Sequence, residues 1–165
     1  MKRSLYISLA IAIVASAGCR PDVGGELGDG WDHVKGITGT WQLAEFYQQD
    51  LNSPINEERD LSHMYLADGI APLELNFDES PRDYTSAIAM GKNFFGDGGS
   101  WSFDDDLYPS FLYLETAVDT LSFDLGRMVR EIDDQMLLEV SGGCVNQWGI
   151  TTQETVTYKF VFERQ

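Results

Sequence analysis

Apolar and polar residues alternate along most of the chain, and this pattern constrains the fold more than any other feature. In residues 155–162 the side chains of Val156, Tyr158, Phe160 and Phe162 share one face, and Thr155, Thr157 and Lys159 lie on the other. A period of two is typical of a β-strand that buries one face. The pattern therefore predicts an all-β fold for the part of the chain that carries it.

Eight segments show this alternation or a short apolar run bounded by turn residues. They are residues 40–47, 73–77, 84–90, 100–103, 111–116, 120–125, 135–140 and 155–162. Residues 128–132 are expected to extend the sixth strand past a bend, and residues 60–66 to form one short helix after the first strand. Consecutive antiparallel strands in this number close most simply into an up-and-down barrel, because closure removes exposed sheet edges. A two-sheet sandwich is the alternative.

The first 18 residues have the layout of a bacterial export signal. Lys2 and Arg3 precede an apolar run over residues 5–15, and residues 16–18 are small. This run is shorter than the roughly 20 residues that a permanent transmembrane helix needs. We expect residues 1–18 to be removed, residues 19–36 to form a flexible tether rich in Gly and acids, and residues 37–165 to form the barrel domain.

Cys19 follows the signal directly, and two interpretations of it stay open. Residues 17–19 resemble the end of a lipobox, whose cysteine is diacylated and becomes the first residue, although Ser16 stands where a bulky aliphatic residue is usual. Alternatively, residues 15–17 fit cleavage after Ala17, which gives a soluble protein. We favour lipid attachment at Cys19. A disulfide to Cys144 is then not expected.

Acidic residues dominate the chain. It has 27 acidic and 11 basic side chains and a formal net charge of −16, and removal of residues 1–18 would take away two of the basic ones. Such a surface disfavours nucleic acid, which requires clustered Lys and Arg. Anionic lipid headgroups would also repel it, so contact with the membrane is expected to come from the lipid anchor.

Several short motifs resemble the lipocalin-like domain of unknown function found in Bacteroidetes lipoproteins. The first is G-x-W at residues 39–41, and the others lie in residues 99–105, 108–109, 118–125 and 158–163. The resemblance runs from about residue 37 to residue 164. It implies an eight-stranded barrel whose closed end is plugged by Trp41, in a lipoprotein of the cell envelope, at the outer membrane. The family has no agreed activity, so the resemblance implies no chemistry.

No catalytic or metal-binding arrangement is evident in the sequence. His33 falls in the tether and His63 in the short helix, and no serine stands in a nucleophile-elbow context. Cys144 has no histidine near it in the sequence and is interpreted as a small buried residue. The run Asp104–Asp106 is interpreted as a solvated turn, because no calcium-loop pattern surrounds it. We expect neither an enzyme nor a cofactor.

Binding is the expected role, and two forms of it are considered. A barrel of eight strands can hold one small ligand or be filled by its own side chains. In the first form, Trp148 with Asn146 and Gln147 would hold a small apolar or glycan ligand near the barrel rim. In the second, the strand aromatics fill the barrel, and loops 53–69 and 142–153 meet protein partners.

Overall fold

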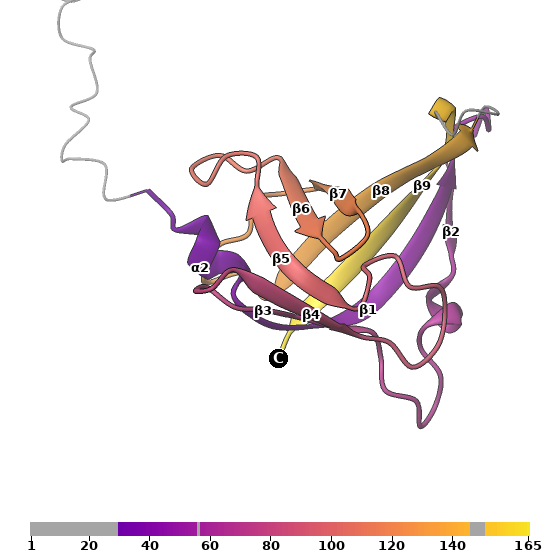
Figure 1. Cartoon of the computed structure of the whole chain (residues 1–165). Coiled ribbons are helices and arrows are strands. Elements are labelled where there is room, and N and C mark those ends of the chain that lie inside the picture. The colour runs from indigo at the N-terminus through magenta and orange to yellow at the C-terminus, as the bar shows by residue number, and fades with distance from the viewer. Residues whose placement is uncertain (1–29, 56, 146–150) are drawn as a thin grey trace, which may run out of the picture. The chain divides into compact units, whose positions relative to one another are not determined.

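The computed structural model describes residues 30–55, 57–145 and 151–165, and these residues are mostly β-strand (Figure 1). One short helix, α2 (His33–Ile37), comes before the strands, and a single 3₁₀ turn, η1 (Ser62–Met64), lies between β2 and β3. The strands are β1 (Gly39–Asp50), β2 (Glu58–Asp60), β3 (Glu74–Phe77), β4 (Asp83–Ala87), β5 (Gly98–Phe103), β6 (Phe111–Glu115), β7 (Thr120–Leu125), β8 (Gln135–Val145) and β9 (Thr151–Arg164).

The strands form one antiparallel sheet that closes on itself. Neighbours follow the order β2-β1-β3-β4-β5-β6-β7-β8-β9, and β1 also pairs with β9. β1 reaches both neighbours because its first residues, Gly39–Gln42, pair with β3 on one edge, while residues 41–50 pair with β9 on the other. The predicted up-and-down barrel is therefore confirmed, with eight strands in the closed ring. The additional strand β2 pairs with residues 47–49 of β1. The sandwich alternative is wrong.

Two segments that were expected to be a helix and a strand take another form. The predicted helix over residues 60–66 is reduced to the η1 turn, because Asp60 pairs with Tyr47 as part of β2. Residues 128–132 are not a strand. They belong to the connection between β7 and β8, where Val129 is buried while Met128 and Ile132 are exposed. Their alternation thus reflects packing of a loop against α2 and not pairing within the sheet.

Trp41 lies fully buried at the end of the barrel where α2 is found, and Arg164 holds it there. The indole Nε1 donates to the carbonyl of Ile37 at 2.7 Å, and the Arg164 guanidinium lies 4.3 Å from the ring centroid. The same guanidinium donates to the carbonyls of Thr38 and Gly36. We call this end of the barrel, with α2 and the connections β3–β4, β5–β6 and β7–β8, the α2 end.

The packed part of the chain begins before residue 37. His33 was expected in the tether, but it is buried, and its Nδ1 lies 2.8 Å from the carbonyl oxygen of Val129. A Cβ on Gly36 would lie 2.3 Å from that same oxygen, so only glycine allows the helix to approach the β7–β8 connection this closely. Asp32 caps α2 by accepting from the backbone N–H of Lys35. The unit that contains the barrel spans Trp31–Gln165.

Candidate functional site

Aromatic side chains occupy the barrel interior, and one of them comes from a loop. Phe95 follows β4 and is fully buried. Its ring stacks on Phe123 at a centroid distance of 4.8 Å and meets Phe160 and Phe162 edge-on at 5.0 and 5.7 Å. Phe94 lies beside it, 5.0 Å from Tyr158. The end of the barrel opposite α2 is therefore filled by the chain's own β4–β5 loop.

Polar contacts hold this loop in place. The buried hydroxyl of Tyr84 donates to the carbonyl of Phe95 at 2.7 Å, and the Tyr65 hydroxyl donates to the carbonyl of Lys92. Burial raises the pKa of Tyr65 to about 12, so the hydroxyl stays protonated and remains a donor at neutral pH. The Asn93 side chain accepts from the N–H of Phe95 and donates to the carbonyl of Gly96.

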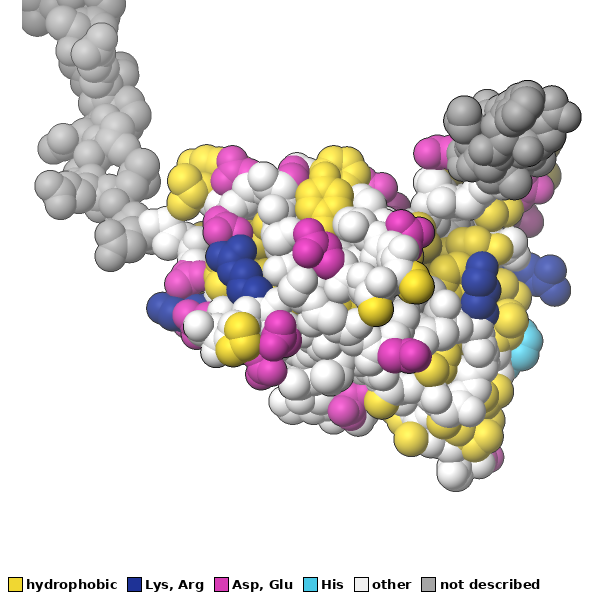
Figure 2. Space-filling view, viewed as in Figure 1, with side chains coloured by type: hydrophobic (Ala, Val, Ile, Leu, Met, Phe, Trp, Pro, Cys, Tyr) yellow, Lys and Arg dark blue, Asp and Glu magenta, His cyan; other side chains and the backbone are white. Residues whose placement is uncertain are grey.

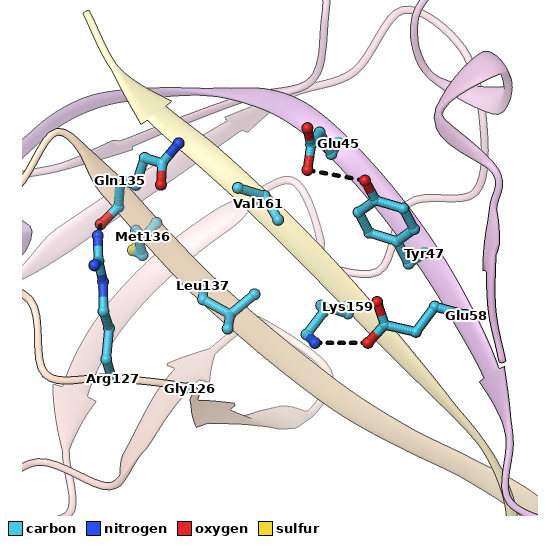
Figure 3. Close-up of a pocket in the computed structure, with 10 residues that line it drawn as sticks. All are labelled: Glu45, Tyr47, Glu58, Gly126, Arg127, Gln135, Met136, Leu137, Lys159 and Val161. Atoms are coloured by element: carbon cyan, nitrogen blue, oxygen red, sulfur yellow. Dashed lines mark hydrogen bonds and ion pairs between the residues drawn. The ribbon is translucent and has the colours of Figure 1, made fainter. Parts of the chain in front are cut away.

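A groove of about 410 Å³ lies on the outer face of the barrel (Figure 3). β1, β8 and β9 form its wall, and the start of the β7–β8 connection and one residue of β2 border it. We call it the outer groove. It is lined by Glu45, Tyr47, Glu58, Gly126, Arg127, Gln135, Met136, Leu137, Lys159 and Val161.

Charged side chains of the outer groove are already paired with one another. Lys159 of β9 lies 2.7 Å from the carboxylate of Glu58 and 3.7 Å from that of Glu139. The bond to Glu58 raises the pKa of Lys159 above its ordinary value. Tyr47 donates to Glu45 at 3.0 Å, and this bond raises the pKa of the phenol. The lining of the outer groove thus carries two carboxylates, Glu45 and Glu58, and two cations, Arg127 and Lys159.

The floor of the outer groove is aliphatic. Val161 and Leu137 are register partners on β9 and β8, and both are half-buried. A Cβ on Gly126 would lie 2.3 Å from Cδ2 of Leu137, so the glycine leaves room for the leucine side chain. Arg127 borders the floor and donates to the carbonyl of Gln135 at 3.1 Å. An aliphatic floor with a charged rim suits a segment of a partner molecule that has both kinds of group.

A second hollow of about 520 Å³ adjoins the turn between β1 and β2. Its lining includes Ser53, Ile55 and Glu57, which lie in the predicted interaction loop 53–69, and it shares Glu58 with the outer groove. Glu58 thus borders both hollows.

The residues predicted to bind a small ligand, Trp148, Asn146 and Gln147, lie outside the described residues, as does Cys19. Ligand binding and lipid attachment at these positions stay predictions. The backbone of Cys144 pairs with Gln153 at the far end of β8.

The other singled-out residues have local roles. His63 lies in η1. Asp104 accepts from the backbone N–H groups of Ser110 and Phe111, and Asp106 pairs with Arg82 at 2.7 Å. These contacts organise the β5–β6 connection, in line with the turn interpretation. Within the described ranges, no group of three or more His, Cys, Asp or Glu side chains is placed to hold a metal ion.

Phe94, Phe95 and the outer groove were not predicted from the sequence. A signal for the loop exists in residues 93–96, where two adjacent aromatics stand between Asn and Gly. The groove has no comparable local signal, because its residues come from four strands and one turn.

Of the residues that the structure describes, none belongs to a helix long and apolar enough to cross a membrane. No known family model matches the chain, and no curated protein matches it. The barrel and its surfaces are thus the observations from which a function can be argued.

Proposed function

We propose that this protein is a non-catalytic lipoprotein of the cell envelope, with a lipocalin-like barrel that serves as a filled scaffold for a protein partner. The observation that carries the proposal is Phe95, which stands fully buried among Phe123, Phe160 and Phe162 where a barrel of this size would hold a ligand. Because the interior is occupied by side chains, recognition is assigned to the outside of the barrel.

The lipid anchor in this proposal is supported by the sequence. Cys19 follows a small-residue exit from an apolar run, and the residues after it have the composition of a tether. The resemblance to Bacteroidetes lipoproteins supports the outer membrane as the location. The anchor would hold the barrel at the membrane, and the acidic surface would keep it soluble there.

The outer groove is the surface we assign to the partner. Its aliphatic floor, Leu137 and Val161, can receive an apolar side chain. Its rim carries Glu45 and Glu58 together with Arg127 and Lys159, and this mixed charge favours a partner segment that has polar or charged groups beside an apolar side chain.

The first experiment asks whether the barrel carries a small molecule. Native mass spectrometry of protein purified from its own host is expected to show only the mass of the lipidated chain. Titration with a fluorescent fatty acid is expected to give no saturable signal. A small molecule retained at one per chain, or micromolar binding of the fatty acid, would contradict the filled-scaffold proposal.

The second experiment tests the outer groove. A photoreactive amino acid is placed at Tyr47, in the groove, or at Tyr113, a half-buried tyrosine on the outer face of β6. Crosslinking in cells is expected to give one discrete protein adduct from position 47, none from position 113, and loss of the adduct on Glu58→Arg. Equal adducts from both positions would show that the groove is not the partner site.

A further inference from the structure

Exposed apolar side chains surround the α2 end of the barrel. Trp31 is 54% exposed just before α2, and Ile132 is 64% exposed in the β7–β8 connection. In the β5–β6 connection, Leu107 and Tyr108 are 69% and 70% exposed. Figure 2 shows apolar side chains among charged ones where Figure 1 places this end. Met128 and Phe111 are further exposed apolar side chains at this end.

These side chains come from distant parts of the sequence, but specific contacts bring them to one end. The Arg130 guanidinium lies 5.3 Å from the Trp31 ring centroid, which joins the β7–β8 connection to the residue before α2. The pKa of Lys35 on α2 is raised, chiefly by its bond to Asp32 and also by the charges of Glu131 and Glu79. Those two acids lie in the β7–β8 and β3–β4 connections, respectively.

The chain reaches the barrel at this same end. Residues 20–30 separate Cys19 from Trp31. Even fully extended, such a segment spans no more than about 40 Å. A lipid on Cys19 would therefore keep Trp31, and the side chains around it, within that distance of the bilayer.

We propose that the α2 end docks on the bilayer that holds the anchor, with its exposed apolar side chains in the headgroup region. This inference rests on the proposed lipid attachment at Cys19. Trp and Tyr are the side chains that favour the membrane interface, and Trp31 and Tyr108 provide one of each. Arg130, stacked on Trp31, can bury its stem and keep its charge among the headgroups.

The shape and charge of this end favour a lipid surface over a protein partner. The apolar side chains protrude from separate connections, and such side chains can each enter the headgroup region of a bilayer. Acids such as Asp32, Glu79 and Glu131 lie between them. The favoured lipids are therefore zwitterionic, since anionic headgroups would repel these carboxylates.

Docking at the α2 end would direct the opposite end, with the β4–β5 loop, away from the bilayer. That opposite end also exposes large apolar side chains, Leu51, Ile55 and Val118 among them. They lie on the β1–β2 and β6–β7 turns, at the other end of the strands from Trp31. They provide a control set of exposed apolar side chains, without an aromatic one, at the end of the strands distant from Trp31.

The test uses residues 19–165 with Cys19→Ala, so that no lipid is attached, and flotation with vesicles of phosphatidylethanolamine and phosphatidylcholine. We expect measurable partitioning that falls about tenfold on combined substitution of Leu107, Tyr108 and Ile132 by Ser, given the apolar area removed. The control triple Leu51→Ser, Ile55→Ser and Val118→Ser is expected to change the partitioning onto vesicles by less than about twofold.

A second measurement does not depend on how the triple variants fold. Brominated lipids are expected to quench part of the tryptophan fluorescence, and Trp31→Phe is expected to abolish this quenching. Circular dichroism checks that each variant keeps its strands. The proposal is overturned if the parent chain does not bind vesicles, if both triples act equally, or if the Leu107, Tyr108 and Ile132 substitutions instead dissociate an oligomer.

Failure of the lipid anchor is detected separately. Metabolic labelling with an alkyne fatty acid reports directly on Cys19 in the full chain. Absence of the label would overturn the anchor in the proposed function, and with it the reason for docking. A labelled Cys19 together with no vesicle binding would overturn the docking surface alone.

Discussion

Replacing Phe95 by Ala removes the ring that fills the end of the barrel opposite α2. The substitution withdraws roughly 100 Å² of apolar surface from the core, which is worth about 2.5 kcal/mol at about 25 cal/mol per Å². The space left among Phe123, Phe160 and Phe162 adds about 1–2 kcal/mol, if roughly 60 Å³ of it stays empty at about 24 cal/mol per Å³. We expect the free energy of unfolding to fall by about 4 kcal/mol.

The assay is urea unfolding followed by tryptophan fluorescence and circular dichroism. The midpoint is expected to fall while the slope stays constant, which is the sign of lost stability without a change in compactness. Phe95→Leu is the matched control and should cost less than about 1.5 kcal/mol, because most of the volume is kept. In addition, the Ala variant should bind xenon, which a small apolar cavity takes up, while the parent protein does not.

A small effect of Phe95→Ala would contradict the filled barrel. If Phe95→Ala cost less than about 1 kcal/mol, the β4–β5 loop would not be part of the core in solution. The barrel would then be open at that end, and small-ligand binding would again become the favoured function.

Three further predictions follow from other contacts. Arg164→Lys should lower the free energy of unfolding by about 2 kcal/mol, measured by urea titration, because a single ammonium cannot both stack on Trp41 and reach the carbonyls of Gly36 and Thr38. The bond from Arg130 lowers the pKa of Asp133 to about 2. The contribution of this ion pair to the free energy of unfolding is therefore full above about pH 4 and is lost as the pH falls toward about 2. Asp133→Asn should therefore remove about 1–2 kcal/mol at pH 7 and reduce the slope of stability between pH 4 and 2, measured by thermal unfolding across that range. In cells, Cys19→Ala should move the protein from the membrane to the soluble fraction, read by fractionation and immunoblot, and a variant still bound to the membrane would contradict the anchor.

Much of the barrel could be predicted from local patterns. Strands with clean alternation, such as β9 with Tyr158, Phe160 and Phe162, were placed correctly because each strand carries its own signal. Loops do not. Residues 128–132 alternate like a strand, yet Val129 is buried against α2 and no strand pairs with them. A local pattern reports which side chains are buried but not what covers them.

The candidate sites depend on contacts between distant residues, and so they were less predictable. Trp41 was singled out from a three-residue motif, but the role of Arg164, 123 positions later, depends on the register of β1 with β9. Likewise, Glu58 of β2 meets Lys159 of β9 in the outer groove because both strands pair with residues 47–49 of β1, one on each edge.

The all-β class, the number of strands in the closed ring and the acidic surface could be read from the sequence, since each of these depends on composition or on a period of two. What fills the barrel depends on contacts between distant residues. Phe95 belongs to a connection outside the predicted strands, and the Tyr84 and Tyr65 hydroxyls hold that connection over the barrel. Closure of a sheet brings together side chains from all its strands, and no segment of the chain carries that information alone.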